Sequence, residues 1–361
     1  MKMRTLLFVS LAAVMGLVLA GCGSGSSTYT ADHARSFVYI YDNNSVNAGA
    51  IISRLHQPMT AAQRKASRMA RVHKLATRAA STGVDIASGS MDLYLYDMTT
   101  NKSTKLNGAY GSLAFETVSM GAYGTKLLFS AYDSKGYVQV FLADAKLRTI
   151  TQLTTDENDH FDAQISIDGN WVAFDNDDGT LYYMSASGGT ATAIKINTSI
   201  VALSYAWNPS FTPDNKSLVF SGNLEDSDGE FIFSAKLDGT GLTQLTNPDQ
   251  AAEYDYYNSV SPDGSTLAFT REIYSEEYGW QENIYTVSIS GESASNVASQ
   301  LTTDGYSWYP LYIGTKILFL DYGPNYYGTG NDNIFSMGID GSSITQLTNT
   351  PYETTFNDLY Y

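Results

Sequence analysis

Short apolar segments and alternating segments recur along this chain in a fixed order. An apolar triplet comes first, as in Val172-Ala173-Phe174 and Leu267-Ala268-Phe269. A segment that alternates around an aromatic residue follows, as in Leu181-Tyr182-Tyr183-Met184. A Leu-Thr pair or its relic then closes each unit, and six such closings, from Leu106-Asn107 to Leu347-Thr348, lie 43 to 56 residues apart. Alternation predicts β-strands, and self-similarity at this period predicts a propeller with four strands in each repeat.

Asp-Gly pairs separate the expected strands. They are Asp168-Gly169, Asp178-Gly179, Asp228-Gly229, Asp238-Gly239, Asp263-Gly264 and Asp340-Gly341. A type I′ hairpin turn needs positive φ at both central residues, which Asp-Gly accommodates. We therefore interpret these Asp residues as turn formers rather than metal ligands. The calcium-like run 175–179 lacks the spacing and the distal Glu of an EF-hand loop.

One repeat carries a resemblance to a known family. Ser261-Pro262-Asp263-Gly264 precedes an apolar strand, an aromatic strand and Gln-Leu-Thr, and this order resembles the WD-like repeat of the TolB β-propeller family. Residues 208–215 are a second near match to its first strand and turn. The resemblance covers about residues 85–361 and implies a propeller that works as an interaction module in the bacterial envelope. That family also carries a separate N-terminal α/β domain, which the basic segment described below replaces here, so membership in a Tol–Pal system does not follow.

The two ends of the chain are expected to share a blade. Residues 36–42 fit the second strand of a blade whose third and fourth strands are 92–97 and 103–107. Residues 356–361 read like a first strand without its turn. Open strand edges invite association, so we expect this segment to complete the N-terminal blade. The sequence predicts an all-β fold, a six-bladed β-propeller over residues 36–361 with one helical insertion.

The first residues of the chain read as an export segment. Lys2 and Arg4 precede an apolar run from Leu6 to Leu19, which is too short for a stable membrane span. The run ends in Leu19-Ala20-Gly21-Cys22, which resembles the lipobox of bacterial lipoproteins. The resemblance implies that residues 1–22 contain a lipoprotein signal peptide, which is cleaved so that Cys22 becomes the lipid-bearing first residue, followed by a flexible tether over 23–35. The lack of an acidic residue directly after Cys22 favours the periplasmic face of the outer membrane. An ordinary secretory peptide is the alternative.

Charge is unevenly distributed along the chain. Residues 85–361 contain 35 acidic and 11 basic residues, whereas residues 51–84 contain seven basic residues and no acid. We expect a basic helix at about 51–82, with Arg64, Lys65, Arg68 and Arg71. Three interpretations stay open: the helix lies against the acidic ring, contacts anionic lipid, or is a mobile plug or partner-binding arm. The acidic ring makes nucleic acid an unfavourable partner.

Aromatic residues mark the most promising binding positions. Five of them begin the expected innermost strands: Phe161, Trp207, Tyr256, Trp308 and Phe356. In the first complete blade Phe115 is the nearest candidate. These residues either pack between blades or form a collar at the mouth of the central channel. The loops 273–282 and 323–331 contribute Tyr278, Trp280, Tyr326 and Tyr327, and exposed Tyr and Trp contribute strongly to binding.

The sequence gives little support for catalysis. It has no G-x-S-x-G motif, and His160 is the one His in the expected propeller. Asp159 and Asp162 beside it leave a cation near the channel open, but we assign no metal, cofactor or catalytic residue. We predict a non-catalytic, monomeric propeller that binds an envelope protein or peptide. A surface glycan-binding protein is the alternative, and an enzyme acting on polysaccharide or peptide is less favoured.

Overall fold

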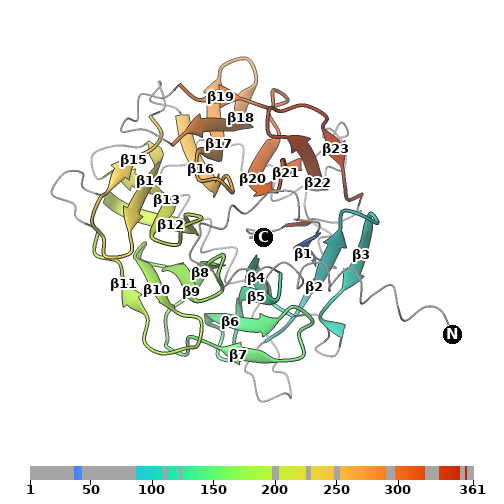
Figure 1. Cartoon of the computed structure of the whole chain (residues 1–361), viewed down its shortest axis with the longest axis vertical. Coiled ribbons are helices and arrows are strands. Elements are labelled where there is room, and N and C mark those ends of the chain that lie inside the picture. Colours follow the sequence, from blue (N-terminus) through green and yellow to red (C-terminus); the bar gives the residue numbers. More distant parts are fainter. Residues whose placement is uncertain are drawn as a thin grey trace, which may run out of the picture.

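The structure is a computed structural model of the whole chain. It describes residues 36–42, 87–108, 111, 113–121, 124–196, 203–224, 229–247, 253–289, 297–321, 333–349 and 354–355. Within these ranges the secondary structure consists of strands only, and the sheets are arranged as a ring (Figure 1). The predicted all-β class is therefore confirmed. The predicted basic helix at 51–82, with Arg64, Lys65, Arg68 and Arg71, lies outside the described residues, as does Cys22.

Three sheets each contain four consecutive strands in antiparallel order. The first consists of β4 (Phe115–Gly121), β5 (Lys126–Tyr132), β6 (Val138–Asp144) and β7 (Ile150–Gln152). The second consists of β8 (His160–Ile165), β9 (Trp171–Asn176), β10 (Leu181–Ser185) and β11 (Thr192–Ala193). The third consists of β20 (Ser307–Ile313), β21 (Lys316–Asp321), β22 (Asn333–Gly338) and β23 (Thr345–Gln346).

An eight-stranded sheet contains the same four-strand unit twice. One unit is β12 (Leu203–Phe211), β13 (Ser217–Leu224), β14 (Glu230–Lys236) and β15 (Thr243–Gln244). The other is β16 (Glu253–Val260), β17 (Thr266–Ser275), β18 (Gly279–Ser288) and β19 (Ser299–Gln300). One parallel pair, Glu230 with Tyr254, joins the two units.

The remaining sheet brings distant parts of the chain together. Its order is β24 (Thr354–Thr355), β1 (Ser36–Asp42), β2 (Ser88–Asp97) and β3 (Lys102–Lys105). Thr354 pairs with Tyr41, and Thr355 pairs with Ile40. Figure 1 shows β1 and β2 between the β20–β23 sheet and the β4–β7 sheet. Residues 356–361 lie outside the described residues, so the six-blade count and the closure by that segment stay predictions.

The closing Gln-Leu-Thr motif has a clear physical role. The Leu153 amide donates to the carbonyl oxygen of Val140 at 2.8 Å, and the Val140 amide donates to the Thr154 hydroxyl at 2.9 Å. The Gln152 side chain donates to the Thr154 carbonyl at 2.9 Å. The motif thus satisfies buried backbone groups where the short fourth strand ends. The same threonine bond recurs at Thr246, Thr302 and Thr348.

The relics of this motif differ from one another. Asn107 replaces the threonine, and its side-chain oxygen accepts from the Leu93 amide at 3.0 Å. In the β8–β11 sheet the Ile194 amide donates to the Leu181 carbonyl at 2.8 Å, so Ile194 occupies the Leu position. The prediction that Ile196-Asn197 closes this unit was wrong by two residues.

The Asp-Gly turns form, but in another conformation. Gly169, Gly239 and Gly264 have φ of 70°, 80° and 73°, whereas their Asp neighbours are not among the residues with positive φ. The type I′ prediction was therefore wrong. The Gly169 amide donates to the Ser166 carbonyl at 2.8 Å, and the Asp168 carboxylate accepts from the Asn170 amide at 3.0 Å. The described Asp residues of these pairs, Asp168, Asp178, Asp238, Asp263 and Asp340, are thus turn formers through their side chains, as expected for Asx-type turns.

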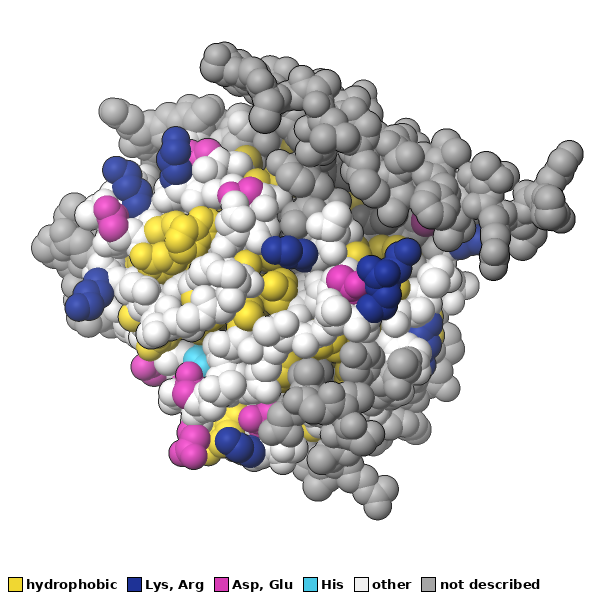
Figure 2. Space-filling model, turned by 60° about the horizontal axis from the view of Figure 1, so that its bottom comes forward, with side chains coloured by type: hydrophobic (Ala, Val, Ile, Leu, Met, Phe, Trp, Pro, Cys, Tyr) yellow, Lys and Arg dark blue, Asp and Glu magenta, His cyan; other side chains and the backbone are white. Residues whose placement is uncertain are grey.

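Apolar contacts join neighbouring sheets around the ring. The second strands contribute Phe129, Phe174, Phe220, Phe269 and Phe319, each at most 1% exposed. On the face turned forward in Figure 2, hydrophobic side chains gather in small patches separated by polar atoms. No helix in the described residues has the length and apolar character needed to cross a membrane.

The strand directions define two ends of the ring. The turn from the second strand to the third, such as 276–278 between β17 and β18, lies at the end that we call the upper end. The connection from the fourth strand to the next innermost strand lies there too. The turns at Asp168, Asp263 and Asp340 lie at the opposite, lower end. The predicted loop 273–282 therefore belongs to the upper end, whereas the loop 323–331 lies outside the described residues.

Candidate functional site

An aromatic cluster lies at the upper end of the eight-stranded sheet. It contains Trp207 of β12, Tyr254 and Tyr256 of β16, and Trp280 of β18. Ring centroids are 6.2 Å apart for Trp207 and Tyr256, and 5.5 Å apart for Tyr254 and Trp280. All four side chains are buried. The cluster therefore joins two neighbouring blades at one end of the ring.

Two aromatic donors of this cluster are hydrogen-bonded to carboxylates. The Trp207 indole donates to Oε1 of Glu230, the first residue of β14. The Tyr256 hydroxyl donates to Oε1 of Glu282 on β18 at 2.5 Å. Hydrogen bonds to a charged acceptor are stronger than those between neutral groups, and they fix the orientation of the carboxylate. Carboxylates and aromatic rings are thus held together at this end.

A buried cation lies beside β16 at the level of the cluster, because its partner Asp255 stands between Tyr254 and Tyr256. Arg271 of β17 contacts Asp255 of β16 through two bonds, Nε to Oδ1 at 2.7 Å and Nη2 to Oδ2 at 2.9 Å. Its Nη1 lies 3.5 Å from Glu253. Burial lowers the pKa of Arg271, but Asp255 and Glu253 outweigh it and raise this pKa above its ordinary value. The guanidinium therefore stays charged and balances carboxylates inside the sheet.

Backbone strain accompanies the innermost strands. Tyr257 and Tyr309 have φ of 51° and 59° at bulges in β16 and β20, and their ring centroids are 4.1 Å apart. Positive φ is uncommon for bulky residues and tends to occur at functional sites. The related bulges in β8 and β12 contain Asp162 and Asn208, which adopt this conformation more readily.

Among the described residues, the most exposed aromatic side chains lie at this end of the ring. Tyr274 is 45% exposed and Tyr278 is 66% exposed, both at the β17–β18 turn. Trp280 lies below them, with its ring centroid 5.2 Å from that of Tyr274. A hydrogen bond to the Glu277 carboxylate raises the pKa of the Tyr278 phenol. The turn therefore presents aromatic rings beside acidic groups to solvent.

The predicted collar is divided between different surroundings. Trp207 and Tyr256 share the cluster above, whereas Phe161 is buried with Tyr132 and Val138 in another cluster. Trp308 is half-buried against the core cluster that includes Phe37. Phe356, Tyr326 and Tyr327 lie outside the described residues. Tyr256 pairs with the residue that directly follows the second-strand Phe of its sheet. In β4 the residue that makes the equivalent pair is Thr117, not Phe115.

The charged members of the site were not predicted from the sequence. Glu230, Glu253, Asp255, Arg271 and Glu282 are spread over more than fifty residues. Their signal is charge inside strands that otherwise alternate between apolar and small polar residues. Such charges are seldom buried without partners. This signal marks Arg271 and Asp255 as a pair only once the strand register is known.

His160 and its neighbours have structural contacts. The His160 Nε2 lies 3.1 Å from Asp156 Oδ1, and its ring packs edge-on against Phe174 at 4.9 Å. Asp159 accepts from the Val138 amide at 2.7 Å. Across the part of the chain that is described, no three His, Cys, Asp or Glu side chains converge as metal ligands would.

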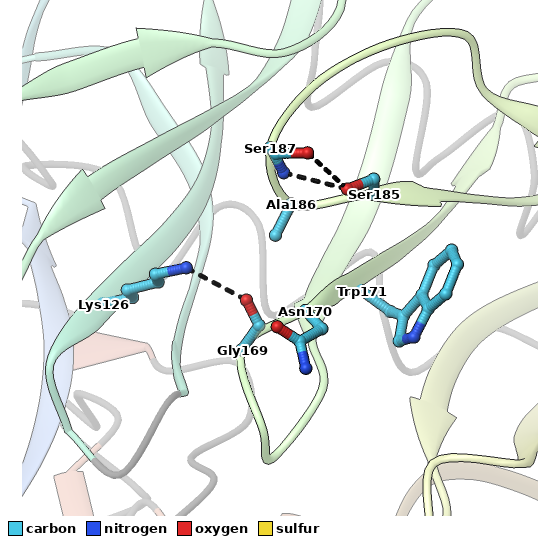
Figure 3. A pocket seen from close by; sticks show the side chains of 7 residues that line it. All are labelled: Lys126, Gly169, Asn170, Trp171, Ser185, Ala186 and Ser187. Atoms are coloured by element: carbon cyan, nitrogen blue, oxygen red, sulfur yellow. Dashed lines mark hydrogen bonds between the residues drawn. The ribbon is translucent and has the colours of Figure 1, made fainter.

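A shallow polar depression of about 250 Å³ lies at the lower end (Figure 3). Lys126 of β5 crosses to the next sheet and donates to the Gly169 carbonyl at 3.0 Å. The Ser185 and Ser187 hydroxyls lie 2.7 Å apart. Figure 3 shows the Trp171 indole on the side of its strand away from Lys126. The depression thus offers mainly polar contacts, with Trp171 as the one aromatic residue among those that line it.

The ring of four-stranded antiparallel units, with an aromatic and carboxylate site at one end, defines a β-propeller. The family model of the TolB beta propeller domain matches residues 78–312, more than half of the chain. The chain therefore belongs to the TolB beta-propeller family, as the repeat motif suggested. Comparison with curated proteins gives no match.

Solved structures agree with this fold. The putative TolB from Agrobacterium tumefaciens is 20% identical with a TM-score of 0.57, over 73% of this chain and 91% of that chain. TolB from Acinetobacter baumannii is 15% identical with a TM-score of 0.58, over 89% of this chain and 65% of that chain. Kuenenia stuttgartiensis hydrazine synthase is 12% identical with a TM-score of 0.60, over 89% of this chain and 46% of that chain. At these identities the likeness shows the fold alone.

Proposed function

We propose that this chain is a non-catalytic binding protein of the bacterial cell envelope, and that its propeller holds a protein or peptide partner at the upper end. One observation carries the proposal. The exposed Tyr274 packs on Trp280, which belongs with Tyr254 to a buried cluster, and the exposed Tyr278 lies in the same turn as Tyr274. Rigid aromatic anchors supported by packing are typical of binding hot spots.

The non-catalytic part of the proposal rests on the sequence and on the contacts of its titratable groups. The chain has no G-x-S-x-G motif. Asp255 and Arg271 are bonded to one another, and Asp168 and Asp263 hold turns. These groups have structural partners rather than the geometry of an acid and base pair.

The envelope location is proposed from residues 19–22 and the tether after them. It includes a lipid anchor at Cys22 and the periplasmic face of the outer membrane. Fractionation of cells producing the full chain tests it, because Cys22→Ala should move the protein from the membrane fraction to the soluble fraction. Equal membrane association of both chains would contradict the anchor.

Partner binding is tested by photo-crosslinking in the envelope. A photoreactive phenylalanine analogue at position 278 should crosslink to a protein neighbour, whereas the same analogue at position 171, at the lower end, should not. Crosslinks that are equal at both positions, or absent at 278, would contradict the proposal.

A glycan-binding function is the second candidate, because the exposed Tyr274 and Tyr278 also suit stacking on sugar rings. Retention on peptidoglycan and polysaccharide gels separates the two candidates. Retention of the parent chain that is lost in Tyr274→Ala/Tyr278→Ala would favour the glycan. No retention of the parent chain, together with a protein crosslink, would favour the protein partner.

A further inference from the structure

The β17–β18 turn combines exposed aromatic rings with a surplus of acidic groups. Residues 271–282 contain Arg271 and four glutamates, Glu272, Glu276, Glu277 and Glu282. Glu276 and Glu277 are exposed and lie between the exposed Tyr274 and Tyr278 in the sequence. The turn is therefore an aromatic surface with negative charge.

Aromatic groups and carboxylates occur together repeatedly at this end. Trp207 donates to Glu230, Tyr256 donates to Glu282, and Tyr278 directly follows Glu277 in the exposed turn. The first two pairs are inside the sheet, and the third is at the surface. An aromatic face beside a carboxylate attracts a cation through both its ring quadrupole and its charge.

The same blade already holds a cation in this way. The guanidinium carbon of Arg271 lies 5.5 Å from the ring centroid of Phe269 and 5.2 Å from that of Tyr285. Asp255 binds the same guanidinium through two oxygens. The positive charge of Arg271 is thus matched within the sheet by Asp255, and the glutamates of the turn add negative charge beyond this pair.

Charge complementarity then indicates which kind of partner segment would bind the β17–β18 turn. An acidic segment would be repelled by Glu272, Glu276, Glu277 and Glu282, and a basic one would be attracted. We propose that the β17–β18 turn binds a basic segment of a partner protein, with Lys or Arg side chains lying over Tyr274 and Tyr278 and bonded to Glu276 and Glu277. This inference rests on the proposed function, since it names the partner chemistry of the same end of the ring.

Fluorescence anisotropy with labelled peptides tests the inference on the purified chain. The probe is a peptide with Arg residues spaced by Gly, Ser and one Trp, compared with peptides of the same length that have Gln or Glu in place of Arg. The basic peptide should bind, the acidic one should not, and added sodium chloride should weaken binding.

Two double variants locate the contact. Glu276→Gln/Glu277→Gln keeps the aromatic rings and should weaken the basic peptide by about three- to tenfold, as expected for two exposed charge pairs. Glu157→Gln/Asp177→Asn is the matched control, because it removes the same charge from the upper end of other blades. It should change binding less than about twofold. Near-ultraviolet circular dichroism confirms that both variants are folded.

Each outcome bears on one of the two claims. Equal weakening by both double variants would overturn the inference in favour of diffuse attraction to an acidic ring. Equal binding of the Gln and Arg peptides would overturn it as well. A protein crosslink at position 278 that is unchanged by Glu276→Gln/Glu277→Gln would leave the proposed function standing and overturn the basic partner. Absence of a protein crosslink at position 278 in the parent chain, with selective binding of the basic peptide retained, would overturn the proposed envelope partner and leave the preference of the turn for basic peptides standing.

Discussion

Asn258 of β16 binds Asn208 of β12, fifty residues earlier in the chain. The Asn258 side-chain Nδ2 donates to the Asn208 carbonyl at 2.9 Å, and its Oδ1 accepts from the Ser210 hydroxyl at 2.7 Å. Asn208 is the bulge residue of its strand, with φ of 51°. The amide thus joins neighbouring innermost strands at the point where a bulge frees a carbonyl from the ladder.

Replacement of this amide should destabilise the ring. Asn258→Ala leaves the Asn208 carbonyl and the Ser210 hydroxyl buried without this partner, and we expect a loss of about 1–3 kcal/mol in the free energy of unfolding. Urea denaturation followed by tryptophan fluorescence measures it. Ser299→Ala on the exposed β19 is the control and should stay within about 0.5 kcal/mol of the parent. Equal stability of all three chains would contradict this role.

The closing motif gives a second prediction. Thr246 accepts from the Ile232 amide at 3.0 Å, and Thr246→Val keeps the side-chain shape but leaves that buried N–H without its acceptor. We expect a loss of about 1–3 kcal/mol in the same denaturation assay. Thr246→Ser retains the hydroxyl and should lose less. A valine variant as stable as the parent, or more stable than the serine variant, would contradict this role of the hydroxyl.

The buried guanidinium gives a third prediction. Arg271→Met leaves Asp255 and Glu253 inside the sheet without their cation, and removal of one partner of a buried pair costs about 3–5 kcal/mol. The double variant Arg271→Met/Asp255→Asn removes both charges of the main pair and should recover part of the loss. A double variant less stable than Arg271→Met would show that Asp255 contributes independently of Arg271.

The strands and their order followed from the sequence because each depends on local pattern. Val172-Ala173-Phe174 and Leu267-Ala268-Phe269 are buried second strands, as their apolar runs indicated. The turn geometry was missed because Asp-Gly suits two turn types. Residue spacing does not distinguish Ile194 from Ile196 as the closing residue, because the spacing between repeats varies. The hydrogen bond from the Ile194 amide to the Leu181 carbonyl identifies Ile194 as that residue.

The site was predictable only in part, because its members meet through the strand register. Aromatic residues at equivalent positions, such as Phe161 and Trp207, look alike in the sequence but lie in different clusters. Their environment depends on which side chains the neighbouring blade contributes. The link between Trp207 and Glu230 needs the pairing of β13 with β14, which residue spacing does not give.

The turn aspartates give a prediction on pH. Hydrogen bonds from the Ser261 hydroxyl and from Ser265 lower the pKa of Asp263 below its ordinary value of 3.8. A lowered pKa in the folded state stabilises the protein above the unfolded pKa, and this contribution is lost as the pH falls through the folded pKa. Asp263→Asn should therefore be less stable than the parent above about pH 5, with a difference that shrinks on acidification.

Urea denaturation at a series of pH values measures this difference. Ser261→Ala removes the main donor to Asp263 and should also reduce the pH-dependent stabilisation by Asp263. This reduction should be smaller than that caused by Asp263→Asn. A difference between the parent and Asp263→Asn that grows toward low pH would contradict the assigned direction of the shift.

The buried aromatic and carboxylate pair of Trp207 and Glu230 gives the last prediction. Trp207→Phe keeps an aromatic ring but removes the indole donor from a buried carboxylate, and we expect a loss of about 1–3 kcal/mol in the free energy of unfolding. Glu230→Gln keeps an oxygen acceptor for the indole and should cost less. The double variant Trp207→Phe/Glu230→Gln has a neutral amide beside the phenyl ring instead of a carboxylate that has lost the indole donor, so the two effects should be less than additive. Additive losses would show that the indole and the carboxylate stabilise the upper end independently of one another.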